Sequence, residues 1–426
     1  MHRIVYSVVF YLALPIVLLR LMVRSIRAPA YRQRIGERFA LQSPPPGFSR
    51  EKRTLWIHAV SVGETVASAP LVAQLQRAYP DAQVVVTTMT PTGSDRVRAL
   101  FADTVFHCYI PYDLPGACNR FLDKYQPSLL ILMETELWPN LVHACHRRGV
   151  RLLLANARLS EKSAAGYGRF PGFSRQLLEK IDTIAAQATP DAERFLKLGA
   201  TAAQVEVTGS LKFNIEIAER DKRAYFAAIA AKSRPVLVAA STREGEEEKV
   251  IGAFEECLKS VPSLLLLLIP RHPERFAKVY RLSAERGLHT VRRSDEEEVS
   301  ANTQVVIGDS MGEMFDYYGI ATIAFVGGSL VDTGCQNVLE PAALGIPILV
   351  GPSQYNFATI CSQLEIAGAL KTVQNETELA QTLALLLADE RAQKEMGERG
   401  RALVRENQDA LPALMKQIEP LIRTDA

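Results

Sequence analysis

The chain has 426 residues, of which 48% are hydrophobic and 23% are charged, and its formal net charge is +2. This length exceeds what one core usually supports, so it favours two domains of ordinary size. The nearly balanced charge does not indicate a nucleic-acid-binding protein. The six cysteines form no Cys-x-x-Cys pair, so neither a disulfide framework nor a zinc ribbon is indicated, and a reducing compartment fits best.

The first 40 residues differ in character from the rest of the chain. Residues 4–19 are uncharged and apolar, broken only by Pro15, and six arginines follow between positions 20 and 38. We expect an uncleaved anchor that spans a bilayer or lies partly in its interface, with the arginines keeping the remainder on the cytoplasmic side. A cleaved signal peptide ending near residues 28–30 is the alternative, but three arginines between the apolar run and that site argue against it.

From residue 53 onward, short apolar runs alternate with amphipathic segments. The first series predicts strands at 54–59, 83–88, 104–110, 128–133, 151–156, 183–186 and 205–208, and helices at 65–79, 92–100, 114–125, 138–148, 169–180 and 191–198. A charged helix is expected around 219–231. The second series predicts strands at 236–240, 264–269, 290–292, 304–307, 321–326 and 346–350, helices at 245–261, 273–286, 311–318 and 338–344, and closing helices within 376–409. This alternation predicts parallel sheets covered on both faces.

The predicted organisation is therefore an α/β protein with two Rossmann-like parallel-sheet domains that face a cleft. The expected boundaries are 1–40 for the anchor and basic segment, 41–215 for the first domain and 216–426 for the second. Ligands in such folds bind beyond the carboxyl ends of the strands.

A glycine turn interrupts the second series between residues 325 and 357. The turn Gly327-Gly328-Ser329 follows an apolar strand, Asn337 is expected to cap the next helix, and Gly345 to end it. A glycine loop that feeds a helix N-terminus favours a phosphate. An ordinary strand–turn–helix unit with nothing bound explains the same pattern equally well.

Acidic residues follow two of the predicted strands of the first domain. Glu64 lies in His58-Ala-Val-Ser61-Val-Gly-Glu64, where Ser61 and Glu64 also have the spacing of a helix capping box. Glu134 and Glu136 follow the continuously apolar strand at 128–133, where a charge is costly unless a ligand or a basic partner compensates it. We expect a functional carboxylate at the second position, whereas at the first the local pattern favours capping and leaves a functional carboxylate as the alternative.

Cationic residues follow several strands in the same way. If each comes directly after a strand, they lie on one rim and suit an anionic ligand. They are Arg158, Lys212, Arg243 and Arg271.

Other catalytic patterns are missing from the sequence. His143 and His146 have helical spacing but no second ligand cluster, which makes a metal site a weak interpretation. The chain contains no Asp-x-Asp, no Walker A motif, no G-x-G-x-x-G after a strand and no G-x-S-x-G elbow.

Taken together, these motifs resemble the 3-deoxy-D-manno-octulosonic acid (Kdo) transferases of Gram-negative bacteria, which are membrane-associated glycosyltransferases of the GT-B fold. The resemblance covers nearly the whole chain. Its motifs are HAVSVGE at 58–64, METELWPN at 133–140, ANARLS at 155–160, TGSLKFN at 208–214, STREGEE at 241–247, IPRHPERF at 269–276, GDSMGEM at 308–314, and the stretch FVGGSL to GIPILVGP that begins at 325.

The resemblance implies an inverting glycosyltransferase of lipopolysaccharide core biosynthesis. It would move Kdo from CMP-Kdo to the 6′-hydroxyl of the tetraacyl lipid A precursor (lipid IVA), without a metal cofactor, at the cytoplasmic face of the inner membrane. Glu64 matches the catalytic glutamate, and Glu134 and Arg158 are expected to position the acceptor or the sugar. The residues expected to bind CMP-Kdo are Ser210, Lys212, Arg271, Met311, Gly312, Glu313, Gly328, Ser329, Asn337 and Glu340.

Two alternatives stay open. One is another membrane-associated GT-B enzyme that acts on a nucleotide sugar, and the other is a catalytically inactive nucleotide-sugar-binding protein. The chain departs from the family pattern at Gly334-Cys335, where a glycine pair is expected. Because cysteine tolerates positive φ poorly, either this position does not need it or the loop differs.

Overall fold

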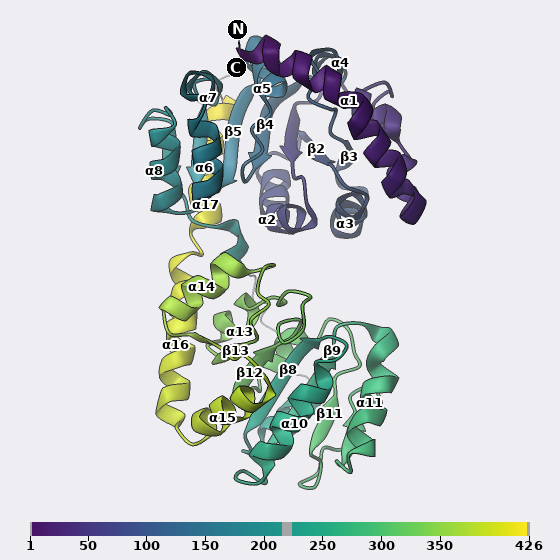
Figure 1. Ribbon diagram of the computed structural model, residues 1–426, viewed down its shortest axis with the longest axis vertical. Coiled ribbons are helices and arrows are strands. Elements are labelled where there is room, and N and C mark those ends of the chain that lie inside the picture. The colour runs from purple at the N-terminus through teal and green to yellow at the C-terminus, as the bar shows by residue number, and fades with distance from the viewer. Residues whose placement is uncertain (1, 215–223, 424–426) are drawn as a thin grey trace. The chain divides into compact units, whose positions relative to one another are not determined.

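The computed structural model describes residues 2–214 and 224–423. It divides into two compact units, Met1–Asn214 together with Gln408–Ala426, and Ile215–Asn407. Each unit is an α/β layer structure built on its own seven-stranded parallel sheet (Figure 1). The predicted fold class, two parallel-sheet domains preceded by a long apolar helix, is confirmed.

The first sheet has the strand order β3-β2-β1-β4-β5-β6-β7. The chain therefore places β2 and β3 on one side of β1 and then β4 to β7 on the other side. This change of direction makes a topological switch point between β1 and β4. The strands are β1 (Thr54–His58), β2 (Gln83–Thr88), β3 (Phe106–Tyr109), β4 (Pro127–Met133), β5 (Arg151–Ala157), β6 (Thr183–Ala186) and β7 (Val205–Val207).

Helices of the first unit cover both faces of this sheet. On β1, Trp56 packs into the core of one face, whereas Leu55 and Ile57 pack into the core of the other, as the two-residue period of a strand requires. The helices are α1 (His2–Arg27), α2 (Val62–Ala78), α3 (Pro91–Phe101), α4 (Pro115–Tyr125), α5 (Pro139–Arg147), α6 (Glu161–Gly168), α7 (Pro171–Leu178), α8 (Thr189–Lys197) and α17 (Ala410–Arg423), with 3-10 turns η1 (Pro29–Arg32), η2 (Ile35–Phe39) and η3 (Leu211–Phe213).

The second sheet has the order β10-β11-β9-β8-β12-β13-β14, so its switch point lies between β8 and β12. Its strands are β8 (Val236–Thr242), β9 (Leu265–Pro270), β10 (Thr290–Arg292), β11 (Val305–Ile307), β12 (Ile323–Val326), β13 (Ile348–Val350) and β14 (Leu370–Thr372). The helices are α9 (Ala224–Ala230), α10 (Glu247–Leu258), α11 (Phe276–Glu285), α12 (Met314–Tyr318), α13 (Leu339–Leu344), α14 (Ala358–Ile366), α15 (Glu376–Leu387) and α16 (Glu390–Glu406), with the 3-10 turn η4 (Pro273–Arg275).

Helix α1 lies against the first unit along one of its own faces. Phe10, Leu14, Val17 and Leu18 pack on an apolar cluster formed by Tyr112, Leu114 and Ala117 together with Phe39 and Met89. Met89 comes directly after β2, and Tyr112 and Leu114 follow β3, so this part of α1 lies at the carboxyl edge of the sheet. The opposite face of α1 is apolar and exposed, as at Leu12 (73%) and Ile16 (70%). By length and composition, Arg3–Ile26 is also long enough to cross a membrane.

The C-terminal helix departs from the predicted domain boundaries. The sequence assigned residues 216–426 to the second domain, but Leu414 and Ile418 of α17 lie in the core of the first unit, on the sheet face that also holds Leu71. The helix contacts β4, β5 and β6. A short amphipathic helix carries no signal for which sheet it covers, so sequence pattern could not assign α17.

The remaining differences are local. The predicted helix at 169–180 is α7, which begins at Pro171, and a further helix that was not predicted, α6, precedes it. Helix α13 begins at Leu339 with Val338 as its N-cap, although the Asn337 side chain still accepts a hydrogen bond from the Leu339 N–H (3.1 Å). The expected charged helix around 219–231 falls partly outside the described residues, and the described part is α9.

Candidate active site

Glu64 lies at the switch point of the first sheet, in the first turn of α2, directly after β1. Its Oε2 accepts a hydrogen bond from the Val60 N–H (2.7 Å), and its Oε1 accepts one from the Ser61 hydroxyl (2.8 Å). The Glu64 N–H in turn donates to Ser61 Oγ (3.2 Å), so Ser61 caps α2 as the spacing predicted, while the Glu64 side chain reaches the Val60 N–H in place of the Ser61 N–H of a standard capping box. The side chain is held in one orientation, and each carboxylate oxygen keeps a second lone pair for a proton.

The environment of Glu64 favours a proton acceptor that works near neutral pH. Burial raises the pKa of its carboxyl to about 7, against the hydrogen bonds from Val60 and Ser61, which lower it. The nearby charges of Glu134 and Glu136 also raise it. A carboxylate whose pKa lies near the working pH is suited to general base catalysis. Capping and catalysis are therefore compatible at this position.

Glu134 and Lys212 form an ion pair at the carboxyl ends of β4 and β7, with Lys212 Nζ 3.1 Å from Glu134 Oε1. Glu134 has a positive φ of 56°, a conformation that costs a non-glycine residue energy and is concentrated at functional sites. Glu136 accepts a hydrogen bond from the Trp138 indole (2.7 Å), and burial raises the pKa of its carboxyl. Lys212 is therefore the basic partner that compensates the charge of Glu134 after β4.

Two other predicted residues of the first unit lie close by in the chain but have different environments. Arg158 is exposed, and its guanidinium makes no ion pair with any residue that the structure describes. Ser210 is buried, and its hydroxyl accepts a weak hydrogen bond from the Lys212 N–H (3.4 Å), so it caps the η3 turn. The turn is further held by Asn156, whose Oδ1 accepts from the Leu211 N–H (3.0 Å).

In the second unit, Arg271, Asn337 and Glu340 come together. Asn337 Nδ2 donates to Glu340 Oε1 (3.0 Å). Burial raises the pKa of the Glu340 carboxyl, whereas the positive charge of Arg271 lowers it. The Arg271 guanidinium therefore lies near the Glu340 carboxylate. Arg271 follows β9, and its N–H donates to the Thr242 carbonyl at the end of the neighbouring β8. The sequence selected all three, and the structure brings them to one edge of the second sheet.

The glycine turn after β12 does not offer its N–H groups to a ligand. The Gly328, Ser329 and Leu330 N–H groups donate to the carboxylate of Glu246, at 2.7, 3.0 and 2.8 Å, and the Arg243 N–H donates to it as well (3.0 Å). Glu246 is fully buried. The expectation that Gly328 and Ser329 cradle the donor phosphate is therefore wrong for these N–H groups, because a carboxylate of the chain itself occupies the anion site.

Glu246 is the residue that sequence reasoning missed. It belongs to the STREGEE motif and lies directly before α10, and nothing in the local pattern indicates that its carboxylate reaches the turn after β12. A Cβ on Gly327 would lie 2.8 Å from Glu246 Oε2 and 2.7 Å from the Ser241 carbonyl, so the close approach of the two loops requires glycine there.

The Met311–Glu313 segment is also used differently from the expectation. The Glu313 carboxylate forms a two-pronged ion pair with Arg293, with both N–O distances 3.1 Å, and both side chains are buried. Its charge is therefore committed to the fold and not free to contact a nucleotide. Gly312 has a φ of +79°, and Met311 is 68% exposed, so a contact from Met311 stays a prediction.

Cys335 does not need a positive φ, which is why it can replace the expected glycine. Only its neighbour Gly334 has one, at 77°. The Cys335 side chain is buried, and its sulfur lies 3.6 Å from that of Cys361 in α14. The loop thus accommodates the substitution by packing.

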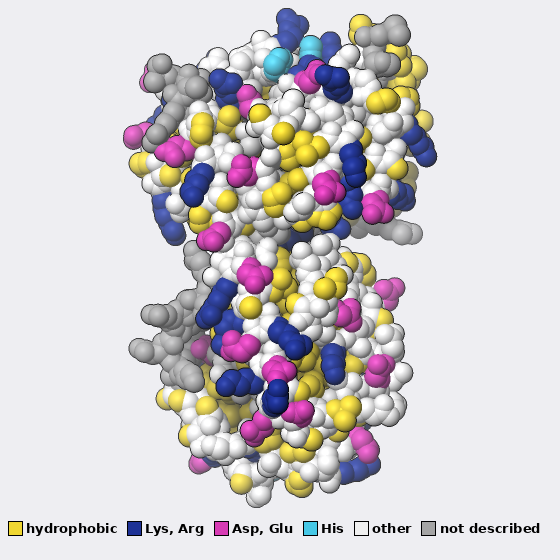
Figure 2. Space-filling model, turned by 90° about the vertical axis from the view of Figure 1, so that its left-hand side faces the viewer, with side chains coloured by type: hydrophobic (Ala, Val, Ile, Leu, Met, Phe, Trp, Pro, Cys, Tyr) yellow, Lys and Arg dark blue, Asp and Glu magenta, His cyan; other side chains and the backbone are white. Residues whose placement is uncertain are grey.

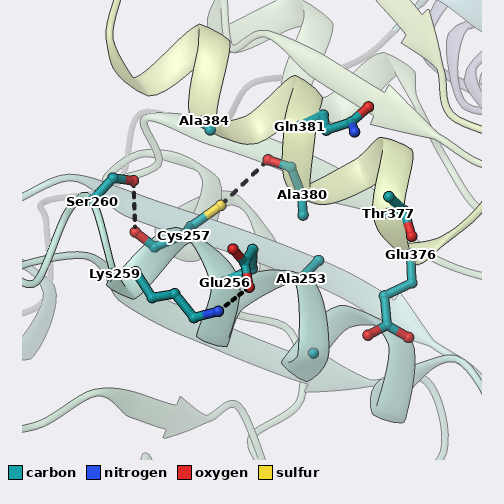
Figure 3. Close-up of a pocket in the computed structure, with 11 residues that line it drawn as sticks. Ala253, Glu256, Cys257, Lys259, Ser260, Glu376, Thr377, Ala380, Gln381 and Ala384 are labelled. Atoms are coloured by element: carbon teal, nitrogen blue, oxygen red, sulfur yellow. Dashed lines mark hydrogen bonds and ion pairs between the residues drawn. The ribbon is translucent and has the colours of Figure 1, made fainter.

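A cavity of about 540 Å³ lies in the second unit between α10 and α15 (Figure 3). Polar groups that line it form hydrogen bonds with one another; for example, the Cys257 thiol donates to the Ala380 carbonyl. It lies beside the C-terminal half of α10, which leads into the amino end of β9, so we do not assign it to the donor. Within the described ranges, no group of three or more His, Cys, Asp or Glu side chains is arranged to hold a metal ion.

Comparison with known proteins connects both units to one enzyme family. Residues 33–215 match the family model described as 3-deoxy-D-manno-octulosonic-acid transferase (kdotransferase), and residues 253–403 match glycosyl transferases group 1. The chain is 39% identical to the 3-deoxy-D-manno-octulosonic acid transferase of Haemophilus influenzae over 99% of both chains. The Bordetella pertussis enzyme of the same name is 40% identical over 82% of both chains.

The chain belongs to the Kdo transferase family. It is accordingly a glycosyltransferase. Among solved structures, MurG of Acinetobacter baumannii shares the fold, with a TM-score of 0.57 at 14% identity over 87% of this chain and 99% of its own. The C-terminal CMP-Kdo binding domain of WaaA from the same organism is 32% identical over 43% of this chain and 99% of its own, with a TM-score of 0.40.

Proposed function

We propose that this Kdo transferase moves Kdo from CMP-Kdo to the 6′-hydroxyl of the tetraacyl lipid A precursor, lipid IVA, with inversion at the anomeric carbon. The observation that carries the proposal is Glu64, a buried and oriented carboxylate with a pKa raised to about 7 at the switch point of the first sheet. An inverting transfer needs one general base, and Glu64 meets both the orientation and the pKa requirement.

In the proposed reaction, the acceptor hydroxyl oxygen attacks the anomeric carbon of Kdo. The bond from that carbon to the phosphate oxygen of CMP breaks, and CMP leaves with the electron pair. The hydroxyl proton passes to Glu64. Since Glu64 retains a free lone pair on each oxygen, it can take this proton without losing its contacts with Val60 and Ser61.

The leaving phosphate needs positive charge, and the exposed Arg271 can supply it beside Glu340. Glu340 would accept hydrogen bonds from sugar or ribose hydroxyls, held in place by Asn337. In the first unit, Lys212 has three N–H donors and would use those beyond its contact with Glu134 for the anionic donor. Glu134 would then position the sugar or the acceptor, and exposed Arg158 the acceptor phosphate or the Kdo carboxylate.

The test is an assay of purified protein with CMP-Kdo and lipid IVA, followed by mass spectrometry of the lipid. We expect a mass gain of one or more Kdo units, no gain with an acceptor that lacks the 6′-hydroxyl, and full turnover in EDTA. A protein that binds CMP-Kdo but never changes the lipid mass would support the inactive binding protein instead. Loss of turnover in EDTA, restored by a divalent cation, would overturn the metal-independent mechanism.

A further inference from the structure

A cluster of cationic side chains lies at the N-terminal end of α1, on α5 and just after α7, and the proposed reaction does not use it. A pocket of about 230 Å³ there is lined by Arg3, His143 and Lys180 together with Gln176 and apolar residues, and no carboxylate lines it within the described chain. His146 and Arg147 of α5 are exposed next to it. We call these five residues the basic patch. Figure 2 shows histidine side chains among Lys and Arg side chains at the top of the first unit, the end where Figure 1 labels α5.

The charges of the basic patch act on one another. The pKa of His143 is lowered first by burial and then by the positive charges of Arg3, Lys180, Arg147 and His146. Like charges that are held together in this way destabilise one another, and a bound anion relieves the repulsion. The grouped positive charges around the pocket therefore favour an anion as the ligand, whereas the two histidines alone are too few ligands for a metal.

The chain fixes the basic patch firmly to α1. Arg3 Nη1 and the Ser7 hydroxyl both donate to Asn140 Oδ1, each at 3.0 Å, at the start of α5. Asp113 accepts from the Asn140 and Leu141 N–H groups at 3.1 and 2.7 Å, which caps α5 and fixes Asn140. The polar end of α1 is thus bound to the folded unit, and its apolar contacts continue the attachment as far as Leu18.

This attachment determines how α1 can meet a bilayer. A helix that crossed the membrane would draw Asn140 and Asp113, which touch it, into the hydrocarbon, where unsatisfied polar groups are costly. A helix that lies in the interface instead buries only its exposed outer face, including Ile4, Val8 and Leu12. The basic patch, beside Ile4, is then at the depth of the lipid headgroups.

We propose that the basic patch binds the phosphate groups of anionic membrane lipids and that, with the outer face of α1, it holds this protein flat on the bilayer. An anionic leaflet attracts basic residues near its surface by an energy that corresponds to roughly fivefold in affinity for each residue. The apolar face provides the second signal that stable attachment requires. The occupant is a membrane lipid, and the site is separate from the carboxylates that surround Glu64.

The test compares the binding of two full-length variants to vesicles that contain neither CMP-Kdo nor lipid IVA, so its outcome does not depend on the transfer reaction. One variant, R147Q/K180Q, removes two charges of the basic patch. The control, R50Q/K52Q, removes two exposed charges that precede β1 and do not belong to the basic patch. Vesicles consist of phosphatidylcholine alone or with one third phosphatidylglycerol, and circular dichroism verifies that both variants are folded.

We expect R147Q/K180Q to bind the anionic vesicles about 30-fold more weakly than the unchanged protein, and R50Q/K52Q to bind almost as well. Binding to phosphatidylcholine alone should be the same for all three. Equal losses in the two variants would show non-specific charge attraction, and no loss in R147Q/K180Q would show that the basic patch does not touch lipid. Either result overturns the proposal.

A second experiment measures how vesicle binding depends on pH and on His143. This side chain lies near Arg3 of α1, Lys180 after α7, and His146 and Arg147 of its own helix. A phosphate in the patch favours the protonated imidazole, so binding to anionic vesicles should strengthen as the pH falls toward about 5.5. H143Q should flatten this dependence while leaving the binding to phosphatidylcholine unchanged. An unchanged pH dependence in H143Q would contradict a lipid phosphate at this position.

Discussion

At the scale of single residues, Glu64 has two tasks that one substitution can separate. In Glu64→Gln, the side-chain oxygen still accepts from Val60 or Ser61, so the start of α2 should keep its cap. The amide cannot accept a proton, and we expect kcat to fall by about 10²- to 10⁴-fold with little change in KM for CMP-Kdo. Steady-state kinetics with a thermal unfolding control measure both. Full turnover in E64Q would show that another group is the base.

The pH dependence of catalysis tests the same residue without a mutation. Burial raises the pKa of Glu64 to about 7, and the base must be ionised, so activity is present above this pH and is lost as the pH falls through it. We expect kcat/KM to decrease about tenfold per pH unit below the midpoint. A profile that stays flat down to the ordinary pKa of a glutamate would contradict a base in this environment.

Glu246 leads to a different prediction, because its fully buried carboxylate accepts hydrogen bonds from four backbone N–H groups. In Glu246→Gln, an NH₂ group faces N–H donors, and the unsatisfied polar groups should cost about 2–4 kcal/mol of stability. We also expect a higher KM for CMP-Kdo, since the loop leads to Asn337 and Glu340. Denaturant unfolding and donor kinetics check the two effects.

Glu244→Gln is the matched control for Glu246→Gln. Glu244 undergoes the same chemical change two residues away, but it is exposed and, among the residues that the structure describes, its carboxylate pairs with Arg275 and Lys278. Its unfolding midpoint and donor KM should equal those of the unchanged protein. If the two variants behave alike, the buried carboxylate does not organise the loop.

At the scale of elements, α17 is expected to stabilise the first unit only. Leu414 is 1% exposed in the core of that unit, and Leu414→Ala should destabilise it by about 2–5 kcal/mol. Hydrogen exchange should accelerate in peptides from β4 and β5 and stay unchanged in peptides from β8 and β12. Lys416→Ala, on the exposed side of the same helix, should leave both sets unchanged. Faster exchange confined to the second unit would contradict the assignment.

Local pattern predicted elements well where the signal is itself local. The continuous apolar run before Glu134 and the capping residues around Glu64 both gave elements that the structure contains. The pattern failed where a partner distant in the chain decides the outcome. The glycine turn after β12 has the sequence of a phosphate loop, but Glu246, more than eighty residues away, fills it. The packing of α17 on the first sheet and the pairing of Glu313 with Arg293 depend on tertiary contacts in the same way.

At the scale of the whole molecule, the two faces of α1 should respond differently to charge. L12E/I16E places carboxylates on the exposed face, so it should leave the thermal unfolding midpoint unchanged and weaken binding to uncharged vesicles roughly tenfold or more. L14E/L18E places them against Tyr112 and Leu114, so it should lower the midpoint. If α1 spanned the bilayer free of the folded unit, both variants would weaken membrane binding equally, and neither would shift the midpoint.

The return of α17 to the first unit has a consequence for how the protein is made. During translation, residues 215–407 of the second unit are synthesised before α17, the helix that packs on one face of the first sheet. Domains usually fold in the order of synthesis, with the N-terminal one first. Here the unit that begins the chain closes last, and until α17 packs, part of one apolar face of its sheet stays uncovered. Truncation of the final helix should therefore produce an aggregation-prone nascent chain even though every proposed site residue is present.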